Sequence, residues 1–199
     1  MVAESVSGGI LVTGFMPFAH HERNISQQMI EYISSDEFFD YEIMTSVLTV
    51  DERGSREISE RIYDGEEISA VLHLGFSENA DEILLERFAR NQLEMKIADN
   101  SGRQVSSGMI SSDKLVLETN APTHIIDEQL EGISGIRWSE DAGGFVCNET
   151  YFRTLLATSS ENSPIVLFVH LPRESIISFS KQLRIVRIIC DALESTTKI

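Results

Sequence analysis

Short apolar segments alternate along the chain with segments whose apolar residues recur every four positions. Residues 10–12, 70–74 and 164–169 are largely apolar over lengths typical of strands buried in a parallel sheet that is covered on both faces. We expect the first strand to break at Thr13-Gly14 and the second to stop at Gly75. Two further strands are predicted at residues 43–50 and 115–117.

The amphipathic segments predict helices. Ile25, Met29 and Ile33 recur every four residues and define one apolar face. Ile58 and Ile62 mark the buried side of a second helix, for which Ser55 is the expected N-cap. Three more helices are predicted: one after Pro122, one at Cys147, and one through the C-terminal residues Leu183, Val186, Arg187 and Cys190.

Strands that alternate with helices predict an α/β fold, a three-layer α/β/α sandwich with a mostly parallel central sheet. Apolar and polar residues alternate strictly from Leu93 to Ile97, which predicts a half-exposed strand, and residues 99–102 predict a turn. We therefore expect a small antiparallel excursion near residues 93–102. A single domain is expected over residues 1–199, with residues 1–8 as a loose N-terminal tail.

Composition narrows the classes of function. The formal net charge of −16 argues against a nucleic-acid-binding face and against attraction to an anionic membrane. Hydrophobic residues make up 42% of the chain, and no apolar segment approaches the roughly 20 residues of a membrane span. No secretory signal is visible, and two cysteines do not make a disulfide framework. A cytoplasmic location is therefore expected.

The segment that ends in Cys147 carries the strongest chemical signal. Gly143 and Gly144 let backbone and substrate approach closely, and Cys147 follows at the predicted start of a helix. The unpaired N–H groups and the dipole of a helix N-terminus favour a thiolate, and the same N–H groups can hold an oxyanion during acyl transfer. Cys147 is therefore a candidate nucleophile that needs a base.

His170 is the candidate base. It ends the apolar strand at residues 164–169, and open α/β sheets place their active sites at the carboxyl ends of their strands. The alternative is a half-buried structural histidine, but a cysteine at a helix start makes the base the better interpretation. With an ordinary imidazole pKa of about 6.5, activity should rise as His170 loses its proton.

No cofactor or metal is expected. His73 lies inside a predicted strand, and the pair His20-His21 has no carboxylate or cysteine at metal-ligand spacing. No Walker or G-x-G-x-x-G sequence follows a strand, so no nucleotide is implied. Cys190 lies on the apolar face of the last helix and is expected to pack there.

Five short motifs follow one another along the chain in a fixed order. They are Thr13-Gly14-Phe15-Met16-Pro17-Phe18, Glu86-Arg87-Phe88-Ala89-Arg90-Asn91, Asp99-Asn100-Ser101-Gly102-Arg103-Gln104, residues 142–148 and residues 168–172. With these motifs the chain resembles the pyroglutamyl peptidase I family, the pyrrolidone-carboxylate peptidases. The resemblance covers nearly the whole chain. It implies a cysteine omega-peptidase that removes N-terminal pyroglutamate from peptides through an acyl-enzyme on Cys147.

The resemblance also implies the catalytic roles. Cys147 would be the nucleophile, His170 the base and later the acid, and Glu86 the carboxylate that orients His170. Such a carboxylate fixes the imidazole tautomer and stabilises the imidazolium. Without the resemblance, Glu86 would look like an ordinary surface acid beside Arg87.

Four positions match the family's substrate pocket. Phe15, Phe18 and Phe145 correspond to residues that clasp the pyrrolidone ring, and flat apolar walls suit a small neutral lactam. Asn24 matches a family asparagine, although Ile25 stands where a proline usually follows. The implied partner is a peptide or small molecule with N-terminal pyroglutamate, and a homodimer or homotetramer is implied as well.

The chain departs from the family pattern around the site, and the departures alter its charge. Glu78-Asn79-Ala80 stands for the usual Gly-Gly-Arg, Ala19-His20 for a Gly-Gly pair, Glu140-Asp141 for a neutral pair, and Glu149 for a common histidine. We expect excess negative charge around Cys147, which disfavours the thiolate. Two alternatives therefore stay open: a diverged thiol hydrolase or amidase that acts on another small lactam or acyl group, and a catalytically silent binding protein.

Overall fold

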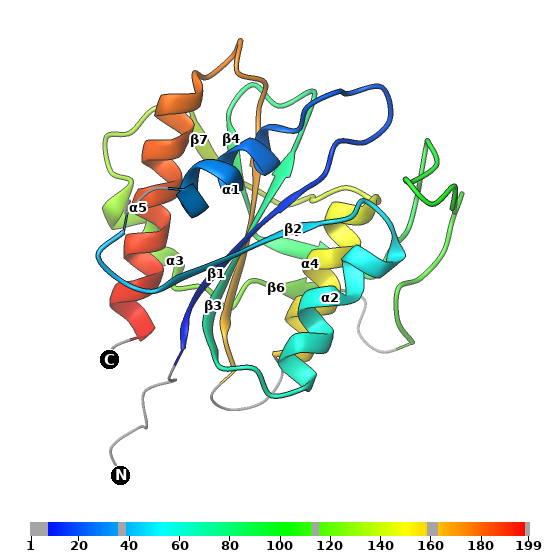
Figure 1. The fold of residues 1–199 in the computed structure, drawn as a ribbon, viewed down its shortest axis with the longest axis horizontal. Coiled ribbons are helices and arrows are strands. Elements are labelled where there is room, and N and C mark those ends of the chain that lie inside the picture. Colours follow the sequence, from blue (N-terminus) through cyan, green and yellow to red (C-terminus); the bar gives the residue numbers. More distant parts are fainter. Residues whose placement is uncertain (1–7, 36–38, 113–115, 159–162, 198–199) are drawn as a thin grey trace.

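A six-stranded sheet with the strand order β2-β1-β3-β8-β4-β7 forms the centre of the molecule (Figure 1). The computed structural model describes residues 8–35, 39–112, 116–158 and 163–197. The first four strands in this order are parallel, whereas β4 pairs antiparallel with β8 and parallel with β7. The strands are β1 (Gly9–Phe15), β2 (Ile43–Leu48), β3 (Ile68–Phe76), β4 (Ile83–Glu86), β7 (Ile136–Ser139) and β8 (Ile165–Leu171).

Helices cover both faces of this sheet, which confirms the predicted three-layer α/β/α arrangement. The helices are α1 (Ile25–Ser35), α2 (Glu52–Tyr63), α3 (Thr123–Gln129), α4 (Val146–Ala157) and α5 (Phe179–Thr197). Figure 1 shows α1, α3 and α5 on one side of the sheet and α2 with α4 on the other. Among the described residues, no helix combines the length and the apolar character needed to cross a bilayer.

The alternation of side chains along the strands divides the core in two. Leu167 and Val169 of β8 pack in the cluster that contains α1, α3 and α5. Val166 and Phe168 point the other way, into the cluster that contains α2 and α4. Because successive side chains point to opposite faces and both faces are buried, the central strands are apolar at nearly every position.

Antiparallel pairing occurs near the predicted segment, but its strands lie on either side of residues 93–102. A second sheet of two strands pairs β5 (Phe88–Arg90) with β6 (Val116–Glu118). Between them, Leu93 makes a single bridge to Gly108, and residues 93–97 are not a strand. The predicted turn at residues 99–102 is present, because Asp99 Oδ1 accepts from the backbone N–H groups of Ser101 and Arg103. The strand predicted at residues 115–117 is observed as β6, while residue 115 and the proposed tail at residues 1–7 lie outside the described residues.

Two predicted strand ends were wrong for the same reason. Strand β1 continues through Thr13-Gly14 to Phe15, and β3 continues through Gly75 to Phe76. A Cβ on Gly14 would lie 2.5 Å from the carbonyl oxygen of Ser26, and one on Gly75 would lie 2.8 Å from the Phe168 ring. These glycines therefore allow close packing inside a strand instead of ending it.

The predicted N-cap of α2 was also wrong. Asp51 is the N-cap, and its carboxylate accepts from the Gly54 N–H at 2.9 Å. Ser55 lies one turn further on, where its hydroxyl donates to the backbone oxygen of Glu52. Strand β4, which the sequence did not predict, carries Glu86 at its end.

Candidate active site

The carboxyl ends of three neighbouring parallel strands meet the N-terminus of α4. Strand β1 ends at Phe15, β3 at Phe76 and β8 at Leu171, one residue after His170. Helix α4 begins at Val146, so Cys147 lies in its first turn, as predicted. This edge is where open α/β sheets place their sites.

The reversed direction of β4 brings Glu86 to His170. In the antiparallel register Leu84 lies opposite His170, and Glu86 lies opposite Phe168. Phe168 and His170 are two residues apart and share a face of the sheet, so Glu86 is a diagonal neighbour of His170 on that face. The Nδ1 atom of His170 lies 2.7 Å from Glu86 Oε1.

Both members of this pair are buried. Glu86 is 0% exposed and His170 is 7% exposed. Burial by itself lowers the pKa of His170, but hydrogen bonds to Cys147 and Glu86, with the charges of both, raise it from 6.5 to about 10. The direction of this shift differs from the ordinary imidazole pKa that the sequence led us to expect, because the sequence could not show that Glu86 and Cys147 both lie beside one ring.

Cys147 is the third member of the series: it lines the same cavity as His170 and is one of the two partners that raise the pKa of His170. Since Nδ1 of His170 is directed to Glu86, the other ring nitrogen, Nε2, is left for the thiol. Cys147 is partly exposed, whereas Cys190 is fully buried, and burial raises the pKa of the Cys190 thiol above its ordinary value. No side chain among the described residues caps α4, whose first N–H groups also lack acceptors within the helix.

A cavity of about 210 Å³ opens beside Cys147 and His170. Phe15, Phe18 and Phe145 line it, as the sequence predicted, and the rings of Phe18 and Phe145 lie 5.8 Å apart. The structure adds wall residues that the sequence analysis did not assign to the pocket: Val50, Phe76, Ser77, Leu84, Asp141 and Ala142. Phe76 and Ser77 were missed because β3 was expected to stop at Gly75.

Asn24 also lines the cavity, but its amide is used by the protein itself. Its Nδ2 donates to the backbone oxygen of Met16 at 3.1 Å, and its Oδ1 accepts from the N–H and the hydroxyl of Ser26. The Ser26 hydroxyl in turn accepts from the Phe15 N–H at 3.0 Å. Asn24 therefore fixes the backbone that carries Phe15, and direct contact with substrate stays a prediction.

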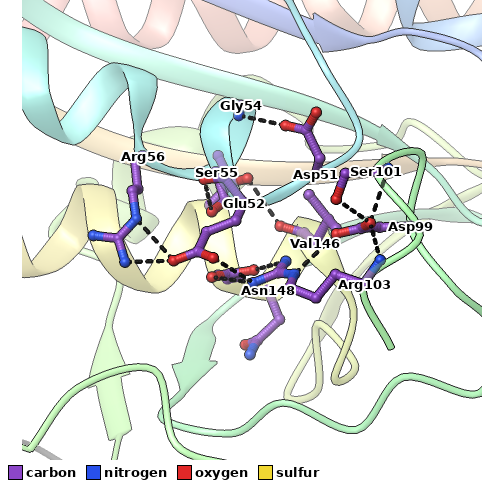
Figure 2. A network of polar contacts seen from close by, with 12 residues as sticks. Asp51, Glu52, Gly54, Ser55, Arg56, Asp99, Ser101, Arg103, Val146 and Asn148 are labelled. Carbon is purple, nitrogen blue, oxygen red and sulfur yellow. Dashed lines mark hydrogen bonds and ion pairs between the residues drawn. The ribbon is translucent and has the colours of Figure 1, made fainter. Parts of the chain in front are cut away.

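Glu149, one of the acids that the sequence placed near Cys147, is neutralised by two arginines. It is fully buried, and Arg103 donates from Nη1 and Nη2 to its two oxygens at 3.2 and 2.6 Å. Arg153 adds a contact of 2.7 Å from the next turn of α4. Figure 2 shows Arg103 also bound to Asp99, so this network joins the turn at residues 99–103 to the start of α4.

Two other introduced acids also have cationic partners. Arg173 donates to Glu78 Oε1 at 2.5 Å, and Arg90 Nε lies 3.8 Å from Asp141 Oδ1. The expected excess of negative charge at the site is thus largely balanced. The sequence shows how many charged residues there are, but it does not show which of them form pairs, because the fold brings these residues together from distant segments.

A thiol, an imidazole and a buried carboxylate in series, at the carboxyl edge of an α/β sheet, form the arrangement of a cysteine hydrolase. The model of the pyroglutamyl peptidase family matches residues 9–182, so this chain belongs to that family.

Named relatives agree with this assignment. The pyrrolidone-carboxylate peptidase of Thermococcus litoralis is 28% identical over 167 residues, which cover 82% of this chain and 76% of that protein. The crystal structure of pyrrolidone carboxyl peptidase from Fervidobacterium islandicum AW-1 is 28% identical, with a TM-score of 0.84 over 95% of this chain and 99% of that one. The crystal structure of pyrrolidone carboxyl peptidase from Thermus thermophilus is 30% identical, with a TM-score of 0.77, and the match covers 90% of this chain and 97% of that one.

Proposed function

We propose that this protein is a cysteine peptidase that hydrolyses the bond after an N-terminal pyroglutamyl residue. The observation that carries the proposal is the series Cys147–His170–Glu86, in which His170 is hydrogen bonded to Glu86, beside a small apolar cavity. Membership of the pyroglutamyl peptidase family supports the choice of substrate. The substrate is a peptide whose first residue is pyroglutamate.

The raised pKa of His170 favours a resting pair of thiolate and imidazolium. Cys147 Sγ attacks the carbonyl carbon of the pyroglutamyl residue, and N–H groups at the start of α4 stabilise the oxyanion. The carbon–nitrogen bond to the next residue breaks as His170 Nε2 gives its proton to the leaving amine. Water then attacks the thioester and gives a proton back to His170, the bond from carbon to Cys147 Sγ breaks, and release of pyroglutamate restores the pair of thiolate and imidazolium.

Glu86 acts through His170 and does not touch the reacting carbonyl. Its Oε1 accepts from Nδ1, which holds Nε2 toward Cys147 and stabilises the imidazolium. The Tyr151 hydroxyl donates to the backbone oxygen of Glu86 at 2.9 Å and so fixes the end of β4. Glu86 is thus a positioning residue in this mechanism.

The shape of the cavity supports a small, neutral ring as the group it holds. Four phenylalanine rings form flat apolar walls, which suit an uncharged lactam and disfavour the charged amine of an unblocked N-terminus. We therefore infer that one blocked residue is released and that internal peptide bonds are not cut.

The test is turnover of pyroglutamyl-aminomethylcoumarin, compared with the glutamyl and prolyl derivatives. The pyroglutamyl compound alone should be hydrolysed. Cys147→Ser should abolish turnover, and Cys190→Ser, the matched thiol control in α5, should retain it. Iodoacetamide should alkylate Cys147 well before the buried Cys190. A folded protein that turns over none of the three compounds, or an active Cys147→Ser variant, would contradict the proposal.

A further inference from the structure

Two histidines and a glutamate gather at the rim of the cavity. One ligand atom from each of His20, His21 and Glu78 lies within 4.8 Å of the other two, so the expectation that this histidine pair has no carboxylate nearby was wrong. His20 and His21 belong to the segment between β1 and α1, and Glu78 lies just after β3. Residues that line the cavity occur in both segments, among them Phe18 and Ser77.

A tight turn holds the two imidazoles together. The His21 N–H donates to the backbone oxygen of Phe18 at 3.1 Å, and Ala19 has a φ of 55°, in the left-handed region. The rings of His20 and His21 lie 4.3 Å apart with 34° between their planes. Neighbouring side chains that usually diverge are thus brought to the same side of the chain.

The second histidine is fixed by its neighbours. The His21 ring packs edge-on against Phe76 at 5.2 Å and against Phe18 at 5.6 Å, and both phenylalanines line the cavity. Its Nε2 lies 3.9 Å from Glu78 Oε1, too far for a hydrogen bond. Glu78 Oε1 accepts from Arg173, which leaves the other carboxylate oxygen, Oε2, for a further ligand.

We propose that His20, His21 and Glu78 bind a divalent transition-metal ion such as Zn²⁺ at the rim of the cavity. Two neutral imidazoles and one carboxylate are ligands that Zn²⁺ accepts, at about 2.0–2.2 Å each, with water in the fourth position. Ligand atoms around a tetrahedral ion lie about 3.3 Å apart by that geometry. His20 and Glu78 are both exposed, so small side-chain rotations can close the observed spacing.

Sequence supports this site as a property of this chain. His20 stands where the family pattern has glycine, and Glu78 stands at another glycine of that pattern. Glycine has no side chain with which to bind a metal. Two ligands from separate segments therefore arose at positions that meet at one rim.

The consequence for activity rests on the proposed function. A bound ion would tie the segment that carries Phe18 to the segment that carries Ser77, across the mouth of the cavity. Substrate would then enter and product would leave through a narrower opening. We expect Zn²⁺ to inhibit turnover reversibly, with chelator restoring it.

Binding is measured by calorimetric titration of Zn²⁺ at pH 7.5 into the Cys147→Ser protein, which removes the catalytic thiol as a competing ligand. Each ligand is then removed in the Cys147→Ser protein, by His20→Ala, His21→Ala or Glu78→Gln. Each substitution should weaken Zn²⁺ binding by at least about tenfold, because loss of even an outer-shell partner of a metal ligand costs about that much. Arg173→Ala should tighten binding, because it frees Glu78. His124→Ala, an exposed histidine on α3, is the matched control and should change nothing.

Two outcomes would overturn the site. One is no Zn²⁺ binding to the Cys147→Ser protein, and the other is that the His20→Ala and His21→Ala variants bind Zn²⁺ as tightly as the Cys147→Ser protein does. Inhibition is then measured on the protein with its native thiol, where the same substitutions should raise the inhibitory Zn²⁺ concentration by the factor found for binding. Unchanged inhibition would overturn the regulatory consequence. Absence of pyroglutamyl turnover without metal would contradict the proposed function and leave the binding result intact.

Discussion

Replacing Arg103 with alanine should lower both the stability of the fold and the reactivity of Cys147. Arg103 holds both oxygens of the fully buried Glu149, which lies two residues after Cys147 in the first turn of α4. It also binds Asp99 Oδ2 at 2.9 Å (Figure 2). Without Arg103, the Glu149 carboxylate keeps the hydrogen bonds from Arg153, which reach only its Oε1 atom.

The size of the effect follows from this burial. Breaking a buried ion pair by removing one partner costs about 3–5 kcal/mol, because a charge is left in a poorly solvated position. Arg153 keeps part of the compensation, so we expect a loss of about 2–3 kcal/mol in the free energy of unfolding. Arg56→Ala is the matched control, because Arg56 and Glu52 form an exposed pair in the same network, and it should cost less than about 0.5 kcal/mol.

The chemical effect is measured separately, as the rate of iodoacetamide alkylation of Cys147. By Coulomb's law, an uncompensated carboxylate at a separation on the order of 10 Å and an effective dielectric constant of 20 disfavours a thiolate by about 1.7 kcal/mol. With Arg153 still present, we expect alkylation to slow by roughly three- to tenfold. Adding Glu149→Gln to Arg103→Ala should restore the rate. Urea unfolding that is no more affected than in Arg56→Ala, or a double variant as slow as Arg103→Ala, would refute the reasoning.

Three further predictions concern other buried groups. Since the pKa of His170 is raised to about 10, kcat/KM should fall only as the pH approaches that value. Glu86→Gln removes one cause of the shift and should move this fall to lower pH. A Glu86→Gln variant whose activity falls at the same alkaline pH would contradict this. Gly75→Ala would place a Cβ 2.8 Å from the Phe168 ring and 3.1 Å from His170 Cδ2, so thermal unfolding should show a loss of about 1–3 kcal/mol, with a fall in kcat. Burial lowers the pKa of His73 to about 3, so the unfolded chain binds one more proton than the folded chain between pH 3 and about 6.5. The free energy of unfolding should therefore rise with increasing pH across this range, by up to about 1.4 kcal/mol per pH unit from this group, and be lost as the pH falls. His73→Gln should flatten this slope in urea unfolding.

The central strands could be predicted from the sequence because burial on both faces leaves a direct signal. Apolar segments marked β1, β3 and β8, and a period of four residues marked α1. The predictions that were wrong are the strand ends at Gly14 and Gly75. A glycine in a one-dimensional pattern looks like an interruption, and only the packing of Ser26 or Phe168 against it shows that the strand continues.

Glu86 could not have been found from residue patterns alone. Its strand, β4, has four residues, too few for a period to be recognised, and an acid at its end looks like a surface group. Its burial follows from the antiparallel pairing of β4 with β8, which no local signal encodes. The motif resemblance supplied the residue, while the structure supplies the reason that it lies beside His170.

The acidity of the chain and the electrostatics of its site are separate properties. The acidic residues near Cys147 in the sequence predict a site that disfavours a thiolate, yet Glu78 and Glu149 pair with arginines 95 and 46 residues away in the sequence. The arginine expected at position 80 is replaced by a buried alanine, and Arg173 approaches Glu78 from another segment. Coulomb interactions fall off with distance, so these close pairs weigh far more on Cys147 than the dispersed surface charges, which salt also screens. The reactivity of the thiol therefore depends on whether Arg103 stays on Glu149, and little on how acidic the rest of the surface is.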